Sequence, residues 1–267
     1  MEIDEERCTP LHFAVLRGEM EKVKHLLSQG ANPNFRDIHA HTPVYRTIMS
    51  SHPDQPQILR LLIQHGANIH IIDNYSESPL YSACFENKFQ LVKIFLEYHA
   101  NSNVCNLWKQ SPLHAACLKD NPDVVEMLLK SGAEPNARDA ENQTPLYVTA
   151  SRNSQLNIAK LLIQYGANPF LPAIIKEENK ILKYPTPSVI AKPEMKQFLN
   201  RAEYRWQHFR DRHVIRFVRL IHSDKNRTLL MSICRIIIEN QQQLTLLIKY
   251  AINRLTLNRM DEIMKQL

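Results

Sequence analysis

Apolar residues recur along the first two thirds of the chain in short segments with a helical period. Val23, Leu26 and Leu27 fall on one face of such a segment, and the apolar residues of Val124–Leu129 do the same. Steps of three and four residues are typical of an amphipathic helix with one apolar face. A helix this short cannot bury that face alone, so the pattern predicts an all-α chain whose helices stack on their neighbours.

A tetrapeptide of Ser or Thr, Pro, an aliphatic residue and His or Tyr precedes the helical segments at regular intervals. The copies are Thr9–His12, Thr42–Tyr45, Ser78–Tyr81, Ser111–His114 and Thr144–Tyr147, separated by 33, 36, 33 and 33 residues. A hydroxyl can cap a helix, and proline is well tolerated at the first helical position. Each tetrapeptide therefore predicts the start of an inner helix in a unit of two helices and a turn.

Two further markers keep the same period. A short Gly-Ala-Asn-like motif closes the second helix of each unit, where glycine supplies a left-handed backbone. An acid or amide stands five residues before each tetrapeptide: Asp4, Asp37, Asp73, Asn106 and Asp139. Together these residues resemble the ankyrin family over about residues 4 to 170. The resemblance implies a solenoid of five ankyrin repeats in residues 1–170.

The 36-residue interval comes from extra residues within Ser50–Pro56, between the two helices of the second unit. Two interpretations stay open: the segment is a contact site particular to this protein, or it is a tolerated loop insertion, since loops accept extra residues at little cost.

The ankyrin resemblance implies that a target protein binds the concave side, through the turn tips and the exposed part of the inner helices. Exposed aromatic residues that cluster on such a face are typical interface anchors. The alternative for Trp108 is that its ring folds back onto the neighbouring tip. The expected target-binding residues are Ile38, His39, Met49, Tyr75, Phe85, Leu107, Trp108, Leu118, Glu141 and Arg152.

Cysteine and glycine usage argues against an enzyme. The five cysteines form no CxxC pair or metal-ligand cluster, and neither Cys105 nor Cys234 lies in a nucleophile motif. Cys84 and Cys117 occupy the same repeat position and are expected to be small core residues. There are only five glycines and no glycine-rich phosphate loop. We therefore expect no catalysis, no cofactor and no metal.

The amino terminus is acidic and poor in apolar residues, so it does not read as a signal peptide. The sequence also lacks a run of about 18 apolar residues, the length needed for a membrane span. An odd number of scattered cysteines favours a reducing compartment. The expected location is the cytosol, or alternatively the nucleus.

The segment after the repeats is basic. Residues 171–267 hold 18 Lys plus Arg against 9 Asp plus Glu, whereas the first 170 hold 15 against 18. Residues 171–200 are predicted to form a degenerate capping repeat around Met195, Phe198 and Leu199. Residues 201–227 are predicted to form a basic amphipathic linker helix that packs on the cap. A membrane-surface helix and a nucleic-acid contact are the alternatives, and we expect neither a nucleic-acid nor a membrane partner.

Residues 228–267 are similar to a SOCS box. Leu230, Cys234 and Ile238 carry the resemblance, since they share one helix face and place a small thiol between two aliphatic residues. The resemblance implies helix-in-groove binding to the elongin B and C pair, through Leu230, Ile233, Cys234, Ile237 and Ile238. It also implies a cullin contact at Leu255 and Leu257, although the prolines usual in that motif are missing there.

Ankyrin units followed by a SOCS box resemble the ankyrin repeat and SOCS box family. The resemblance implies a non-catalytic substrate-recognition subunit of a cullin-RING ubiquitin ligase, with elongin B and C, a cullin of the fifth type and an unidentified target as partners. Its contribution to ubiquitin transfer is proximity. The main alternative is a stand-alone ankyrin adaptor, for example a microbial effector, with no link to a ligase.

Overall fold

The computed structural model describes residues 5–152, 156–171, 173, 175–177, 180–182 and 186–204 of the 267-residue chain. The repeats and the segment that follows them, up to Asn200, belong to one compact unit. Most of the expected linker helix, from residue 205, and the whole SOCS-box-like segment, residues 228–267, lie outside the described residues. The predicted elongin and cullin contacts therefore remain predictions.

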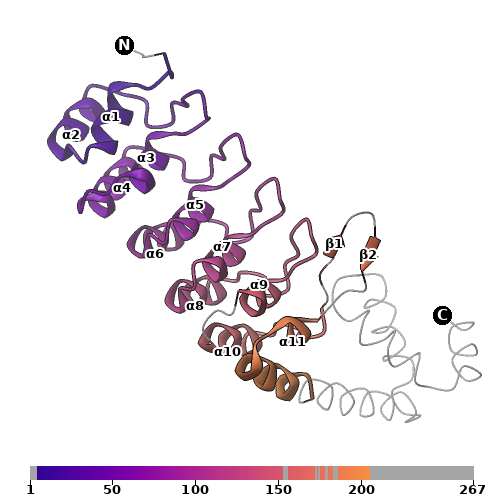
Figure 1. The fold of residues 1–267 in the computed structure, drawn as a ribbon. Helices are drawn as coiled ribbons and strands as arrows, with labels where there is room; N and C mark the ends of the chain where they lie inside the picture. The colour runs from indigo at the N-terminus through magenta and orange to yellow at the C-terminus, as the bar shows by residue number, and fades with distance from the viewer. Residues whose placement is uncertain are drawn as a thin grey trace, which may run out of the picture. The chain divides into compact units, whose positions relative to one another are not determined.

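Ten helices form five antiparallel pairs that stack in chain order, with the connecting loops projecting on one side (Figure 1). Each inner helix packs on the inner helix of the next pair, and each outer helix on the next outer helix. The inner helices are α1 (Pro10–Leu16), α3 (Pro43–Met49), α5 (Pro79–Phe85), α7 (Pro112–Leu118) and α9 (Pro145–Ser151). The outer helices are α2 (Met20–Ser28), α4 (Gln55–Gln64), α6 (Phe89–Glu97), α8 (Pro122–Lys130) and α10 (Leu156–Gln164). The predicted helical solenoid is confirmed.

The tetrapeptides begin the inner helices as expected. Their Ser or Thr residue is extended, proline is the first helical residue, and the hydroxyls of Ser78 and Thr144 each accept a hydrogen bond from the backbone amide three residues on, at 3.2 Å. At the other end of the unit, Gly30 takes a φ of +79° just after α2. In the third unit His99 takes the same left-handed conformation without being a glycine, with a φ of +59°.

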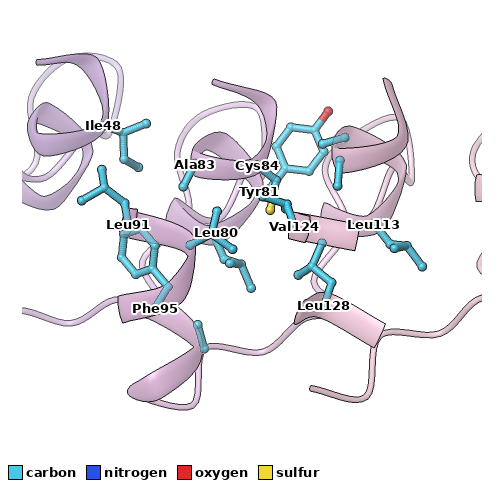
Figure 2. Close-up of a cluster of buried hydrophobic side chains, with 14 of the residues drawn as sticks. Ile48, Leu80, Tyr81, Ala83, Cys84, Leu91, Phe95, Leu113, Val124 and Leu128 are labelled. Atoms are coloured by element: carbon cyan, nitrogen blue, oxygen red, sulfur yellow. The ribbon is translucent and has the colours of Figure 1, made fainter. Parts of the chain in front are cut away.

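A continuous apolar core runs between the helix pairs. Figure 2 shows Leu80, Leu91 and Phe95 of the third pair in the cluster that continues into Leu113 and Leu128 of the fourth pair. All five side chains are almost completely buried.

Cys84 and Cys117 lie in this same layer and are also buried. Burial raises the pKa of the Cys117 thiol to about 12 and raises the pKa of Cys84 as well. A thiol with so high a pKa is a poor nucleophile, so these two cysteines act as small core residues.

The connection after α10 differs from the all-α prediction. Strands β1 (Ile175–Glu177) and β2 (Lys180–Leu182) form an antiparallel hairpin in which Glu177 pairs with Lys180. β-branched residues such as Ile175 and Ile181 favour extended strands. Helical periodicity cannot reveal it.

After the hairpin the chain returns to helix. Helix α11 (Pro187–Ile190) packs on α9, and residues 193–204 are helical. The side chains of Met195 and Leu199 are buried and belong to the same apolar cluster as the repeats, and Phe198 packs against it. These three side chains extend the core beyond the last repeat helix. Among the described residues, no helix is both long and apolar enough to cross a bilayer.

Candidate partner-binding surface

The acid or amide that precedes each of the last four tetrapeptides closes the turn tip, whereas Asp4 lies outside the described residues. Oδ1 of Asp73 accepts hydrogen bonds from the amides of Tyr75 and Glu77, both at 2.8 Å. The tip reverses at Ser76, whose φ is +58°. Asp37, Asn106 and Asp139 accept the equivalent two bonds at 2.8 to 3.0 Å. This third sequence marker therefore fixes the conformation of the tip.

Neighbouring tips are joined by backbone hydrogen bonds. The amide of Leu107 donates to the carbonyl of Tyr75 at 2.9 Å, and the amide of Ala140 donates to the carbonyl of Trp108 at 2.8 Å. The amide of Asn74 likewise donates to the carbonyl of His39 at 3.2 Å. Each tip is therefore held in register with the next one, so the side chains on the tips have fixed relative positions.

Large apolar side chains are exposed on the tips and at the ends of the inner helices. We refer to the six predicted ones as the inner strip: Ile38 (46% exposed), Met49 (53%), Tyr75 (54%), Phe85 (39%), Leu107 (61%) and Trp108 (51%). Ile38, Tyr75, Leu107 and Trp108 lie on the tips, whereas Met49 and Phe85 are the last residues of α3 and α5. The sequence pattern alone assigned all six residues to tips or to the ends of inner helices.

The aromatic rings of the inner strip are oriented by contacts within the protein. Tyr75 and Trp108 stack across neighbouring tips, with ring centroids 6.0 Å apart and planes 16° apart. Trp108 therefore does lie against the neighbouring tip, as the alternative interpretation had it, and half of its surface is still exposed. Phe85 stacks on Tyr81 at 6.3 Å and 11°. Rings that are already ordered lose less entropy when a partner binds.

The other predicted target-binding residues differ in exposure. Leu118 is half-buried and packs on the core, so it offers less surface than its neighbours. His39, Glu141 and Arg152 are exposed. The carboxylate of Glu141 accepts a hydrogen bond from the side-chain amide of Gln143 at 2.6 Å. Target binding by these residues stays a prediction.

Two lysines on this side were not among the predicted site residues. The ammonium of Lys119 lies 4.0 Å from the centroid of the Phe85 ring, a cation–π contact. Lys109 follows Trp108 at its tip and is exposed. The equivalence of inner-helix end positions points to residue 119, but spacing does not reveal the contact with Phe85.

Between the first two tips lies a polar cluster formed by Cys8, Asp37, His41, Arg46 and Asp73. The guanidinium of Arg46 donates to Asp37 Oδ2 at 2.7 Å and to Cys8 Sγ at 3.1 Å. The His41 ring lies between the two carboxylates, 3.8 Å from Asp37 and 3.6 Å from Asp73. Burial nevertheless lowers the pKa of His41, because desolvation outweighs the attraction of both carboxylates.

The histidines of the tetrapeptides have a structural role. Nδ1 of His12 accepts a hydrogen bond from the Thr9 amide at 3.1 Å, so the proton sits on Nε2, which donates to the His41 carbonyl at 3.3 Å. His114 repeats the arrangement with Ser111 and Gln143. Burial lowers the pKa of both imidazoles. In its neutral form, each imidazole connects the start of its own helix to the neighbouring tip.

The inserted segment of the second unit is anchored on both sides. His52 covers Gly18, where an added Cβ would lie 2.2 Å from the imidazole Cγ. The Lys88 ammonium donates to the Ser50 carbonyl at 3.0 Å. Ser51, His52 and Pro53 are exposed. The insertion is thus a positioned surface element, which leaves both interpretations of it open.

The fold and the inner strip define a class: a repeat solenoid that presents a preordered apolar surface. The family model described as ankyrin repeats in three copies matches residues 11–106, 47–139 and 80–173, which together cover more than half of the chain. The chain belongs to the ankyrin-repeat family. Ankyrin repeats are non-catalytic protein-interaction modules. The described residues hold no cluster of His, Cys, Asp and Glu suited to a metal ion.

One curated relative is the human transient receptor potential cation channel subfamily A member 1. It is 30% identical over 87 residues, which are 32% of this chain and 8% of that protein. The chain therefore spans a small fraction of that relative's length.

Proposed function

We propose that this protein is an adaptor that binds a partner protein on the inner strip. The observation that carries the proposal is the exposure of six large apolar side chains on mutually bonded tips and adjoining helix ends. Contiguous exposed apolar surface on a folded protein marks an interaction site, and tryptophan and tyrosine are the usual anchors.

Loss of one anchor tests this part of the proposal. Replacing Trp108 by Ala removes a half-exposed ring without opening the core, so we expect the variant to fold normally and to lose its partners. The measurement is affinity purification of the tagged full chain from cells with quantitative mass spectrometry. Tyr98→Ala is the matched control, because Tyr98 is a partly exposed aromatic residue that follows the outer helix α6. Equal recovery of every partner with both variants would refute the strip as the binding surface.

The finer proposal is that the adaptor is the substrate receptor of an elongin B and C cullin-RING ubiquitin ligase. It is supported by Leu230, Cys234 and Ile238 on one predicted helix face, in a segment that follows ankyrin repeats. The protein would then hold its target near the ubiquitin-loaded partner, and the rate gain would come from proximity.

A double substitution tests the ligase link. Leu230→Asp with Cys234→Phe places a charge and an oversized ring on the predicted elongin-binding face. We expect the wild-type chain to co-elute with purified elongin B and C in size-exclusion chromatography and the double variant to elute alone, with unchanged thermal unfolding of the repeats. Wild-type protein that does not co-elute would favour the stand-alone adaptor, with the inner strip still as its binding surface.

A further inference from the structure

Basic side chains adjoin the aromatic part of the inner strip. Lys109 follows Trp108 on its tip, and Lys119 directly follows α7, with its ammonium over the Phe85 ring. Arg152 directly follows α9, the next inner helix along the stack. All three side chains are exposed.

These three cations have no carboxylate partner within 4.0 Å in the part of the chain that the structure describes. Six other basic residues there do have one: Arg17, Lys22, Lys24, Arg46, Arg60 and Lys130. The charges next to the aromatic rings are therefore not neutralised by ion pairs within the described solenoid.

The same surface also carries acidic residues, which include Asp120 directly after Lys119. Glu141 is exposed and accepts a hydrogen bond from the side-chain amide of Gln143, and Glu86 is exposed directly after α5. Glu77 is half-buried, and burial, together with the nearby Asp73 carboxylate, raises the pKa of its carboxyl. The surface around Trp108 and Phe85 thus combines apolar rings with two exposed lysines, Lys109 and Lys119, that form no ion pair within 4.0 Å among the described residues.

We infer that the inner strip binds an acidic segment of its partner, in which an aromatic or aliphatic side chain contacts Tyr75 and Trp108 while neighbouring carboxylates contact Lys109 and Lys119. This inference rests on the proposed function and adds the chemistry of the partner. Apolar contacts exclude water from the rim, and the attraction between the lysines and carboxylates strengthens as water is excluded. The arrangement provides affinity through the rings and selectivity through charge.

Selection from a random library tests the chemistry without knowledge of the natural partner. Phage displaying random 16-residue peptides are panned against the immobilised full chain, and the enriched peptides are resynthesised with a fluorescent label for anisotropy titrations. We expect enriched peptides to carry Asp or Glu next to an aromatic or aliphatic residue. We also expect their affinity to fall as sodium chloride is raised, because salt screens charges at an exposed rim.

Charge reversal tests the residues. The double variant Lys109→Glu and Lys119→Glu should weaken binding of these peptides by about tenfold, since two attractive contacts become repulsive. The matched control is Lys93→Glu with Lys160→Glu, which changes the same charge at two exposed positions on the outer helices α6 and α10. The control should bind as the wild type does.

The outcomes separate this inference from the proposed function. The inference of an acidic partner is overturned if the enriched peptides are neutral or basic, or if they bind the Lys109 and Lys119 variant as tightly as the wild type. In that case, loss of peptide binding in Trp108→Ala would still support the inner strip as the binding surface. If no peptides are enriched, or if the enriched peptides bind Trp108→Ala as tightly as the wild type, the result counts against both the acidic partner and the proposed binding surface. Tight binding of a labelled single-stranded DNA 20-mer, lost in the same lysine variant, would assign the cations to nucleic acid instead.

Discussion

The first and the central tips of the solenoid share one backbone design and use it for opposite purposes. At the first tip, the Asp37 carboxylate belongs to a polar network with Arg46 and His41. At the central tips, Tyr75 and Trp108 lie on the surface and stack on each other. The comparison shows that the hydrogen bonds closing the tip leave the neighbouring side chains free to serve either stability or recognition.

Equivalent positions account for the contrast. The inner-helix position of Arg46 is occupied by Ser82, Ala115 and Val148 in the next three units. At the first tip, a carboxylate is needed to pair with the guanidinium of Arg46. Where no guanidinium occupies the equivalent position, an amide such as Asn106 is enough to close the tip.

The largest effect is expected from Asp37→Ala. This substitution removes the two backbone hydrogen bonds of the tip and leaves the Arg46 guanidinium, whose side chain is 13% exposed, without its carboxylate. Breaking a buried ion pair from one side costs about 4 kcal/mol. We expect a loss of that size in the free energy of unfolding, measured by urea denaturation followed by circular dichroism.

The control for Asp37→Ala is the same change at the uncharged tip. Asn106→Ala removes the bonds that the Trp108 and Gln110 amides donate, for which about 2 kcal/mol is expected. Trp108→Ala should cost less than about 1 kcal/mol of stability because its ring is half exposed, although about 2 kcal/mol of partner binding is expected to depend on it. Equal losses for Asp37→Ala and Asn106→Ala would contradict a distinct role for the charged network.

Much of this surface follows from the sequence because it depends on local rules. Each tip closes through a carboxylate or amide at a fixed distance before the tetrapeptide, and the period then places Tyr75, Phe85 and Trp108 on one side without any knowledge of tertiary contacts. The fold could be predicted for the same reason, since each repeat contacts only its neighbours.

What the sequence did not reveal depends on contacts between units. Arg46 reaches Cys8 of the preceding unit as well as Asp37 of its own, and Lys119 reaches the Phe85 ring of the preceding unit. Periodicity aligns such positions but does not tell which side chains meet. The β1–β2 hairpin lies in a stretch that interrupts the period, so the repeat pattern gives no guide there.

The smallest effect is expected from His41→Gln, which gives the first tip the residue found at Gln110 and Gln143. Because the pKa of His41 is lowered in the folded protein, the unfolded chain takes up the proton first as the pH falls below about 6.5. The stability that the neutral imidazole contributes is complete above that pH and is lost as the pH falls toward the folded-state pKa.

Between pH 7 and pH 5, wild type should therefore lose more stability than His41→Gln, by less than about 1 kcal/mol. Both proteins should still weaken in acid, because the pKa values of His12 and His114 are lowered too. Urea denaturation at each pH measures the difference. If acid instead stabilised the wild type relative to the variant, His41 would have to be protonated and paired with Asp37 and Asp73. The first tip would then be held together by charge attraction at low pH, whereas the central tips would not respond.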